Sequence, residues 1–318
     1  MASAPHPEPP QRLVNFLGGP DHPWLTGLDA LTRELLTRWE LTAERPALPG
    51  GRTSLVLLVR QADGSPAVLK LCGPGARLRP GDPTTARPEP AAQAEAEAAA
   101  LARWGGLGAV RLLRADPGAG ALLLERLHGE MSLRSLPEAK AMLEAASAVR
   151  RLWVPPGEGC RFPTVAGHTA VEVDGVLGRA PEAVRPLVDA ALLAREELLA
   201  GDGGGPGVLL HGDFRQGAVL ASDAERAPWL AVGPEPLVGE PAFDLARLAR
   251  DRLHDLVASP GAPAATRRRV HKLADSLDVD ADRLRGWTLY RAVESGVRHL
   301  LRGDRQDGEL LLEFAGWL

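Results

Sequence analysis

A carboxylate at the end of an apolar strand, in His211-Gly212-Asp213, is the feature of this sequence that most directly suggests catalysis. The apolar residues 208–210 run into this short polar loop, and residues 218–221 leave it as a second apolar segment. A carboxylate so placed can take a proton from an attacking hydroxyl group, which is general-base chemistry. The structural alternative is a turn in which Asp213 hydrogen-bonds to its own backbone. On the local sequence alone, the turn is the more frequent outcome.

Lys70 is a second candidate, because it interrupts an apolar strand predicted at residues 67–72. A buried ammonium group is costly unless it meets a partner. In a phosphoryl-transfer site such a lysine contacts the nucleotide phosphates and is held by a helix glutamate. Glu97, or less favourably Glu95, lies on the next predicted helix. The alternative is a solvent-facing lysine on an edge strand, but lysine occurs only three times in this arginine-rich chain, which favours a function.

Thr53 and Ser54 follow two glycines, Gly50 and Gly51, in front of a strand predicted at residues 55–59. Such a turn could place backbone N–H groups near phosphates. Its spacing matches neither the P-loop nor the dinucleotide-binding fingerprint. Two glycines before a strand more often form a plain turn.

The segments that would carry these residues begin as a mixed unit. The spacing of apolar residues predicts helices over residues 24–41 and 91–104. Between them, an Asp63-Gly64 turn joins two apolar strands into a hairpin. Two further apolar segments follow the second helix. We therefore expect a disordered stretch at residues 1–23 and then a β-rich lobe over residues 24–127.

The rest of the chain, residues 128–318, is predominantly helical in pattern. A strand-rich hairpin at residues 208–233 interrupts the helices. Apolar periodicity predicts these helices over residues 137–153, 181–200, 240–257, 266–277, 280–301 and 308–317. The order of the elements predicts an α+β fold with two lobes, a small β-rich one and a larger helical one.

Composition narrows the class of partner. The net charge of −4 and the pI near 6.1 give no indication of a nucleic acid or an anionic membrane as partner. No apolar run approaches the length of a membrane span, and the N-terminal stretch lacks the apolar core of a secretion signal. Cys72 and Cys160 lie far apart and form no metal or redox motif. We expect a cytoplasmic protein that binds a small molecule or a protein partner.

Taken in order, these pieces resemble the aminoglycoside and hydroxyurea phosphotransferases, in particular the streptomycin 6-phosphotransferase type. The resemblance covers roughly residues 24–257 and rests on several motifs in the family's order. They lie at residues 53–56, 63–70, 97–104, 108–113, 121–127, 210–213 and 229–244. The resemblance implies a bilobal protein-kinase-like fold and ATP as the phosphate donor.

The resemblance also implies a role for each matched residue. Lys70 would order the nucleotide phosphates with Glu97 as its ion-pair partner, and Asp213 would be the catalytic base. Thr53 and Ser54 would lie near the phosphates, and the backbone from Glu125 to Leu127 would meet the adenine. His211 and Asp244 would be structural supports of the catalytic loop, residues 211–217.

Two positions depart from the family pattern, and both concern magnesium. The family has an Asn five residues after the catalytic Asp and a second Asp after the following hairpin. This sequence has Ala218 and Gly233 there, and neither supplies a side-chain oxygen. Magnesium requires oxygen ligands in near-octahedral geometry, and it neutralises the transferred phosphoryl group. We therefore expect no magnesium ligand at these two positions.

Other polar groups nearby offer incomplete replacements. Gln216, Asp223 and Glu235 lie close to these positions in the sequence and could turn an oxygen towards a metal, but their spacing does not require it. Solvated loop residues are the more common outcome. Arg215 and Glu235 also stand where the family often has a His and a Lys.

A Pro- and Gly-rich stretch at residues 73–90 is longer than in the family pattern and is predicted to be a mobile loop. It carries Arg77, Arg79 and Arg87. These could cover the nucleotide site or dock a partner, although most such loops are tolerated insertions.

These observations leave three hypotheses. Loss of both metal ligands favours a pseudoenzyme that binds a nucleotide or another ligand, or regulates a partner, without efficient turnover. Intact Lys70 and Asp213 favour an active ATP-dependent phosphotransferase acting on a hydroxyl of an aminoglycoside-like molecule. The third hypothesis is an unrelated interaction domain, in which changes at Lys70 or Asp213 would have no measurable effect. The acceptor is not identified, because acidic residues such as Glu294 and Glu313 are interspersed with arginines.

Overall fold

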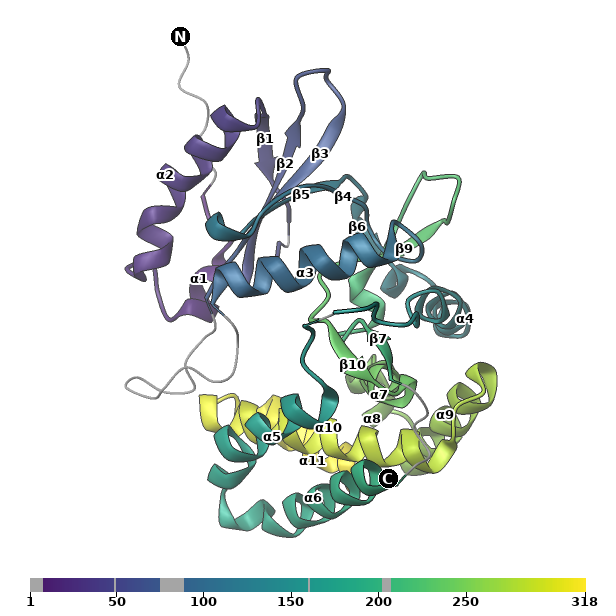
Figure 1. Ribbon diagram of the computed structural model, residues 1–318. Helices are drawn as coiled ribbons and strands as arrows, with labels where there is room; N and C mark the ends of the chain where they lie inside the picture. The colour runs from purple at the N-terminus through teal and green to yellow at the C-terminus, as the bar shows by residue number, and fades with distance from the viewer. Residues whose placement is uncertain (1–7, 49, 75–88, 160, 202–206) are drawn as a thin grey trace. The chain divides into compact units, whose positions relative to one another are not determined.

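The computed structural model describes residues 8–48, 50–74, 89–159, 161–201 and 207–318 of the chain (Figure 1). The described residues divide into two units. The first holds those up to residue 132 together with residues 220–232, and the second holds residues 133–219 and 233–318. The predicted fold class is confirmed, since the first unit is built around a sheet and the second is mostly helical. Most of the predicted loop at residues 73–90, with its three arginines, lies outside the described residues.

An antiparallel sheet of five strands forms the centre of the first unit, in the order β1-β2-β3-β5-β4. Its strands are β1 Thr42–Pro46, β2 Ser54–Arg60, β3 Pro66–Cys72, β4 Leu112–Asp116 and β5 Ala121–Glu125. The hairpin of β2 and β3 turns at the predicted Asp63-Gly64, where Gly64 has a φ of 81°. This left-handed conformation is the one that glycine adopts without strain.

The alternation of side chains along β3 decides where Lys70 points. Ala67, Leu69 and Leu71 are buried in a cluster with apolar residues of helix α2, Pro23–Arg38. Because successive side chains of a strand face opposite sides, Lys70 lies on the other face of the sheet. Helix α3, Pro90–Trp104, covers that face with its buried side.

The predicted disordered terminus contains a helix. Residues 11–17 form α1, Gln11–Leu17, and its Leu13 is fully buried in the same cluster as α2. A seven-residue helix is too short to be stable alone or to show a clear period, so the sequence did not reveal it. Packing of one leucine against a neighbouring core is what holds it.

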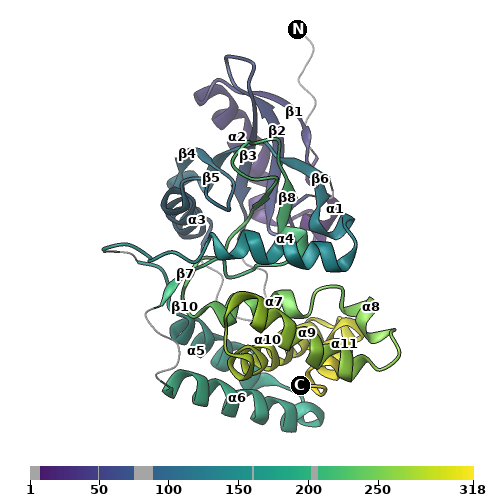
Figure 2. The ribbon, with the colours of Figure 1, turned by 90° about the vertical axis from the view of Figure 1, so that its right-hand side faces the viewer.

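Three short strands extend the first unit. They are β6 His128–Ser132, β8 Val219–Ala221 and β9 Trp229–Ala231, in the order β6-β8-β9. Figure 2 labels β6 and β8, the first two of them. The prediction had placed the hairpin of residues 208–233 in the helical lobe. In the structure, Leu220 and Ala221 pair with β6, and residues 220–232 belong to the first unit.

The second unit is helical around one short antiparallel strand pair, β7 Val208–Leu210 with β10 Leu237–Gly239. The long helix α10 packs against α6, α7 and α11. The helices are α4 Glu138–Arg150, α5 Val165–Gly175, α6 Arg185–Ala200, α7 Pro241–Ala249, α8 Leu253–Val257, α9 Ala262–Leu277, α10 Ala281–Arg302 and α11 Arg305–Ala315. No helix among the described residues is both long and apolar enough to cross a membrane.

The helix predicted over residues 240–257 is divided into α7 and α8. Arg252 breaks it, with a left-handed φ of 55°. Its guanidinium group donates to the side-chain oxygen of Gln216 at 2.8 Å and to the carbonyl oxygen of Leu136 at 2.7 Å. Hydrogen bonds to distant segments therefore outweigh the local preference for a continuous helix, and periodicity alone could not show this.

Candidate active site

Lys70 and Glu97 form a buried ion pair in the first unit. The Nζ of Lys70 lies 2.5 Å from Oε2 of Glu97, and the two residues are 8% and 0% exposed. Glu95, the less favoured partner, is exposed on the opposite side of α3. A buried ion pair is expensive to desolvate and is weak evidence for stability. The other carboxylate oxygen of Glu97, Oε1, is buried and has no hydrogen-bond partner among the described residues.

The other nucleotide candidates of this unit lie on strands or next to them. Ser54 is buried within β2, and Thr53 accepts a hydrogen bond at its carbonyl from Gly73 at 2.9 Å. Glu125 ends β5, and its side chain is committed: Oε1 accepts the backbone N–H of Arg111 at 2.7 Å and also pairs with Arg226. The backbone N–H of Glu125 also donates to the carbonyl of Arg111 at 3.0 Å. Sequence reasoning did not find Arg226.

The catalytic loop, residues 211–217, is held in place by Asp244. This residue is fully buried in the first turn of α7. Its two carboxylate oxygens accept the backbone N–H groups of His211 at 2.8 Å and Gly212 at 2.7 Å. Burial raises the pKa of Asp244 to about 6, although these two hydrogen bonds act in the opposite direction. The structure thus places His211 and Asp244 together.

Asp213 is paired on both sides by arginine. Its Oδ1 lies 2.5 Å from Nε of Arg247, and its Oδ2 lies 3.2 Å from Nε of Arg215. Burial alone would raise the pKa of Asp213, but the charges of Arg247 and Arg215 outweigh it and hold the pKa well below its usual range. The carboxylate is therefore ionised, and both of its oxygens already have cationic partners.

Arg247 was missed by sequence reasoning. A usable signal existed, because Arg247 follows Asp244 by three residues on a predicted helix and three-residue spacing places side chains on one face. Once Asp244 is assigned to support the loop, Arg247 must point towards the same loop.

The two positions that depart from the family's metal-ligand pattern, Ala218 and Gly233, supply no side-chain oxygen in the structure. Ala218 is buried at the end of a 3₁₀ turn, and Gly233 follows β9 with a φ of 66°. Among the described residues there is no group of three or more His, Cys, Asp and Glu side chains that could hold a metal ion.

The suggested replacement ligands are occupied elsewhere or lie in a different place. Gln216 is buried, and its side-chain oxygen accepts a hydrogen bond from Arg252 at 2.8 Å. Asp223 belongs to the first unit and pairs with His128 at 2.8 Å. Glu235 is exposed, and its backbone N–H donates to the carbonyl of His211 at 2.8 Å. The donor set present therefore does not fit magnesium.

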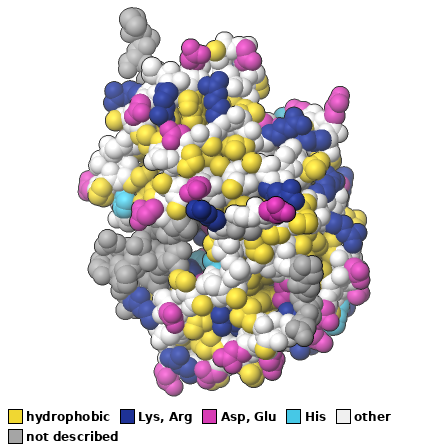
Figure 3. Space-filling model, viewed as in Figure 1, with side chains coloured by type: hydrophobic (Ala, Val, Ile, Leu, Met, Phe, Trp, Pro, Cys, Tyr) yellow, Lys and Arg dark blue, Asp and Glu magenta, His cyan; other side chains and the backbone are white. Residues whose placement is uncertain are grey.

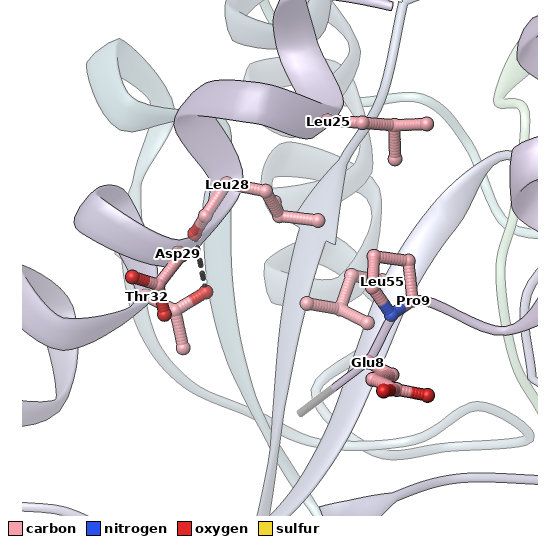
Figure 4. Close-up of a pocket in the computed structure, with 7 residues that line it drawn as sticks. All are labelled: Glu8, Pro9, Leu25, Leu28, Asp29, Thr32 and Leu55. Atoms are coloured by element: carbon pink, nitrogen blue, oxygen red, sulfur yellow. Dashed lines mark hydrogen bonds between the residues drawn. The ribbon is translucent and has the colours of Figure 1, made fainter. Parts of the chain in front are cut away.

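A separate pocket of about 250 Å³ lies in the first unit (Figure 4). Leu25 and Leu28 of α2 face Leu55 of β2 across it, and Glu8, Pro9, Asp29 and Thr32 complete the lining. None of the predicted site residues lines this pocket, so we do not assign it to the active site.

Comparison with known proteins identifies the family. Residues 38–303 match the model of the aminoglycoside/hydroxyurea antibiotic resistance kinases. The chain is 37% identical over 295 residues to streptomycin 6-kinase of Streptomyces glaucescens. This match covers 91% of this chain and 87% of the streptomycin 6-kinase. This chain belongs to the aminoglycoside/hydroxyurea antibiotic resistance kinase family. Another relative is the hydroxyurea phosphotransferase of Kitasatospora aureofaciens, 35% identical over 313 residues, with 94% and 79% of the two chains covered.

Solved structures show the same fold. An aminoglycoside phosphotransferase of Streptomyces rimosus, in complex with ADP and streptomycin, matches with a TM-score of 0.53 and 21% identity. The match covers 84% of this chain and 97% of the other. The family resemblance and the protein-kinase-like fold predicted from the sequence are both confirmed.

Proposed function

We propose that this chain is a pseudoenzyme of the aminoglycoside/hydroxyurea kinase family, which binds a nucleotide but transfers its phosphoryl group inefficiently. The observation that carries the proposal is the pairing of Asp213 with Arg247 and Arg215. To accept a proton from a hydroxyl group, Asp213 must leave one of these partners. A carboxylate with a strongly lowered pKa also offers little driving force for proton transfer.

The missing metal ligands support the same proposal. In phosphoryl transfer, a metal ion bridges the phosphate oxygens and neutralises the charge that develops on them. A bound ion contributes several kcal/mol of transition-state stabilisation. Ala218 and Gly233 cannot hold it, and the neighbouring oxygens of Gln216 and Asp223 are committed elsewhere.

The nucleotide part of the proposal rests on the first unit. The buried pair of Lys70 and Glu97 has the arrangement that positions a lysine for nucleotide phosphates. Thr53 and Ser54 would lie near those phosphates, and the backbone from Glu125 to Leu127 would meet the adenine. ADP and streptomycin in the Streptomyces rimosus structure support a nucleotide and a polar small molecule as the ligand classes.

The second candidate function is an active ATP-dependent O-phosphotransferase acting on a hydroxyl group of an aminoglycoside-like molecule. The specific observation in its favour is that Lys70, Glu97 and Asp213 are all retained, with the ion pair formed. The name of one relative, a streptomycin 6-kinase, supports this substrate class, and the name of the other, a hydroxyurea phosphotransferase, supports phosphoryl transfer to a different small molecule. The two candidates differ in whether magnesium stimulates ATP consumption.

Calorimetric titration of ATP, with and without magnesium, separates them. For the wild-type chain we expect binding that magnesium does not tighten and no magnesium-stimulated hydrolysis. Ala218→Asn combined with Gly233→Asp should then raise magnesium-dependent ATP turnover at least about tenfold, because it restores two oxygen ligands. Lys70→Met in the double-variant background is the control and should remove the gain. Magnesium-dependent turnover by the wild-type chain would overturn the pseudoenzyme proposal.

A further inference from the structure

The two arginines beside Asp213 use only a small part of their hydrogen-bonding capacity. Each contacts the carboxylate through Nε. A guanidinium group carries five N–H donors, and among the described residues the Nη nitrogens of Arg215 and Arg247 have no acceptor. The side chains are 33% and 30% exposed, so these donors are accessible. Asp213 offsets one of the two positive charges. Burial lowers the pKa of Arg247, but the charges of Asp213 and Glu235 outweigh burial and raise it.

Gly217 allows the arginines to come close to the loop backbone. A β-carbon on Gly217 would lie 2.7 Å from Nη1 of Arg215, and 3.7 Å from Nε of a third arginine, Arg134. Arg134 is 59% exposed and lies 3.6 Å from Asp251. Asp251 in turn accepts the backbone N–H of Gln216 at 2.5 Å. Arg215 and Arg134 therefore both lie beside Gly217, and Asp251 is the carboxylate partner of Arg134.

These guanidinium groups lie on or beside the loop that precedes Ala218, the position at which the family places a magnesium ligand. The residues present do not fit a divalent cation, and positive charge is supplied by guanidinium groups instead. Guanidinium forks match the oxygen spacing of a phosphate group and can bind it through two parallel hydrogen bonds. They do so without a metal.

We propose that Arg215 and Arg247, with Arg134 beside them, form a metal-independent binding site for a phosphate group. The Nη donors hold the phosphate oxygens, while Asp213 stays on the Nε side and limits the affinity through its like charge. The inference rests on the proposed function, in that it takes metal-dependent transfer to be lost. The phosphate comes either from a nucleotide or from a phosphorylated small molecule.

Titration of inorganic phosphate by calorimetry, in EDTA at low salt, tests the site without a nucleotide. We expect saturable binding that Arg215→Gln weakens at least about tenfold and Asp213→Asn tightens by a similar factor, because it removes the competing charge. Arg268→Gln, an exposed arginine on α9, has the same change in charge and should leave binding unchanged. Asp213→Asn keeps the test valid if Arg215→Gln fails to fold.

Titration of ATP in EDTA identifies the source of the phosphate. If a nucleotide supplies it, Arg215→Gln weakens ATP binding by the same factor. If a phosphorylated small molecule supplies it, Arg215→Gln weakens phosphate binding and leaves ATP binding unchanged. No phosphate binding by either the wild type or Asp213→Asn, or equal weakening by Arg268→Gln, would overturn the inference. If the phosphate site fails these tests, ATP binding that does not depend on metal would still support the proposed pseudoenzyme function. Failure of the phosphate site is therefore distinguishable from failure of the proposed function.

Discussion

At the scale of single residues, the catalytic loop depends on the absence of a side chain at Gly212. This residue has a φ of 79°, and a β-carbon there would fall 1.8 Å from the carbonyl oxygen of Glu235. The same backbone segment donates the N–H of Glu235 to the carbonyl of His211. Two chain segments therefore cross at a distance that only glycine permits.

Gly212→Ala should lower the free energy of unfolding by at least about 3 kcal/mol, because it adds a backbone clash to the strain of a positive φ. Gly233→Ala is the matched control. Its φ of 66° is similar, but a β-carbon there would meet nothing within 4 Å. We expect that variant to lose only about 1 kcal/mol. Urea unfolding measures both, and equal losses would show that the close approach to Glu235 carries no energy.

At the scale of elements, helices α5 and α10 are joined by a charged network. Glu172 of α5 lies 3.3 Å from Nε2 of His168 and 3.5 Å from Nη2 of Arg298, and it accepts a hydrogen bond from the hydroxyl of Tyr290 at 3.3 Å. Arg298 also pairs with Glu294. These carboxylates are therefore committed to partners within the unit, which explains why no acidic patch for a cationic acceptor could be read from the sequence. Figure 3 shows acidic and basic side chains interspersed on the visible face.

This network makes stability depend on pH. Burial lowers the pKa of His168, but the hydrogen bond and charge of Glu172 outweigh burial, so the pKa is raised above its usual value of 6.5. A raised pKa in the folded state means that the stabilising contribution is complete below pH 6.5 and is lost as the pH rises through the higher, folded-state value. His168→Gln should therefore cost roughly 1–2 kcal/mol at pH 6 and clearly less at pH 9. His271→Gln, an exposed histidine on α9, should show no such difference. Urea unfolding at the two pH values decides, and an equal cost at both would exclude a charged His168.

The same helix shows why part of the fold could not be predicted. Helix α5 contains Gly167 near its start, and glycine is unfavourable within a helix. Thr164 caps its start, and the Thr164 side chain accepts the N–H of Gly167 at 3.1 Å. The helix is held by the hydrogen bond from Tyr290 to Glu172, two residues that are 118 positions apart in the sequence. Local propensity is weak here, and the partners that override it are distant in the sequence. Long periodic helices such as α10 carry their own signal and were predicted.

At the scale of the whole molecule, the family motifs predicted the fold class and brought the expected residues together within each unit. Lys70 meets Glu97, and Asp244 supports His211 and Gly212. What could not be predicted is the state of Asp213. Arg215 and Arg247 pair with it through contacts that depend on side-chain direction, and only the three-residue spacing from Asp244 to Arg247 indicated one of them. The sequence therefore indicated which ligands are missing, but not what charge takes their place.

The three lysines of the chain provide a direct measure of nucleotide binding to the whole protein. Lys70 is 8% exposed and paired with Glu97, whereas Lys140 and Lys272 are exposed on helices of the second unit. An amine-acylating reagent attacks the neutral, accessible amine. We therefore expect Lys140 and Lys272 to be modified at least about tenfold faster than Lys70 in the folded chain, and all three at similar rates in urea.

Saturating ATP should slow the modification of Lys70 further and leave Lys140 and Lys272 unchanged, since only Lys70 is expected to contact the nucleotide phosphates. Mass spectrometry of peptides that contain each lysine gives the three rates in one sample, so the two exposed lysines are internal controls. Glu97→Gln should raise the rate at Lys70 by removing the carboxylate that pairs with its amine. Protection of all three lysines alike would indicate a general effect of ATP on the reagent. No protection of Lys70 would contradict nucleotide binding by this pair, because a bound phosphate must compete with the reagent for the same amine.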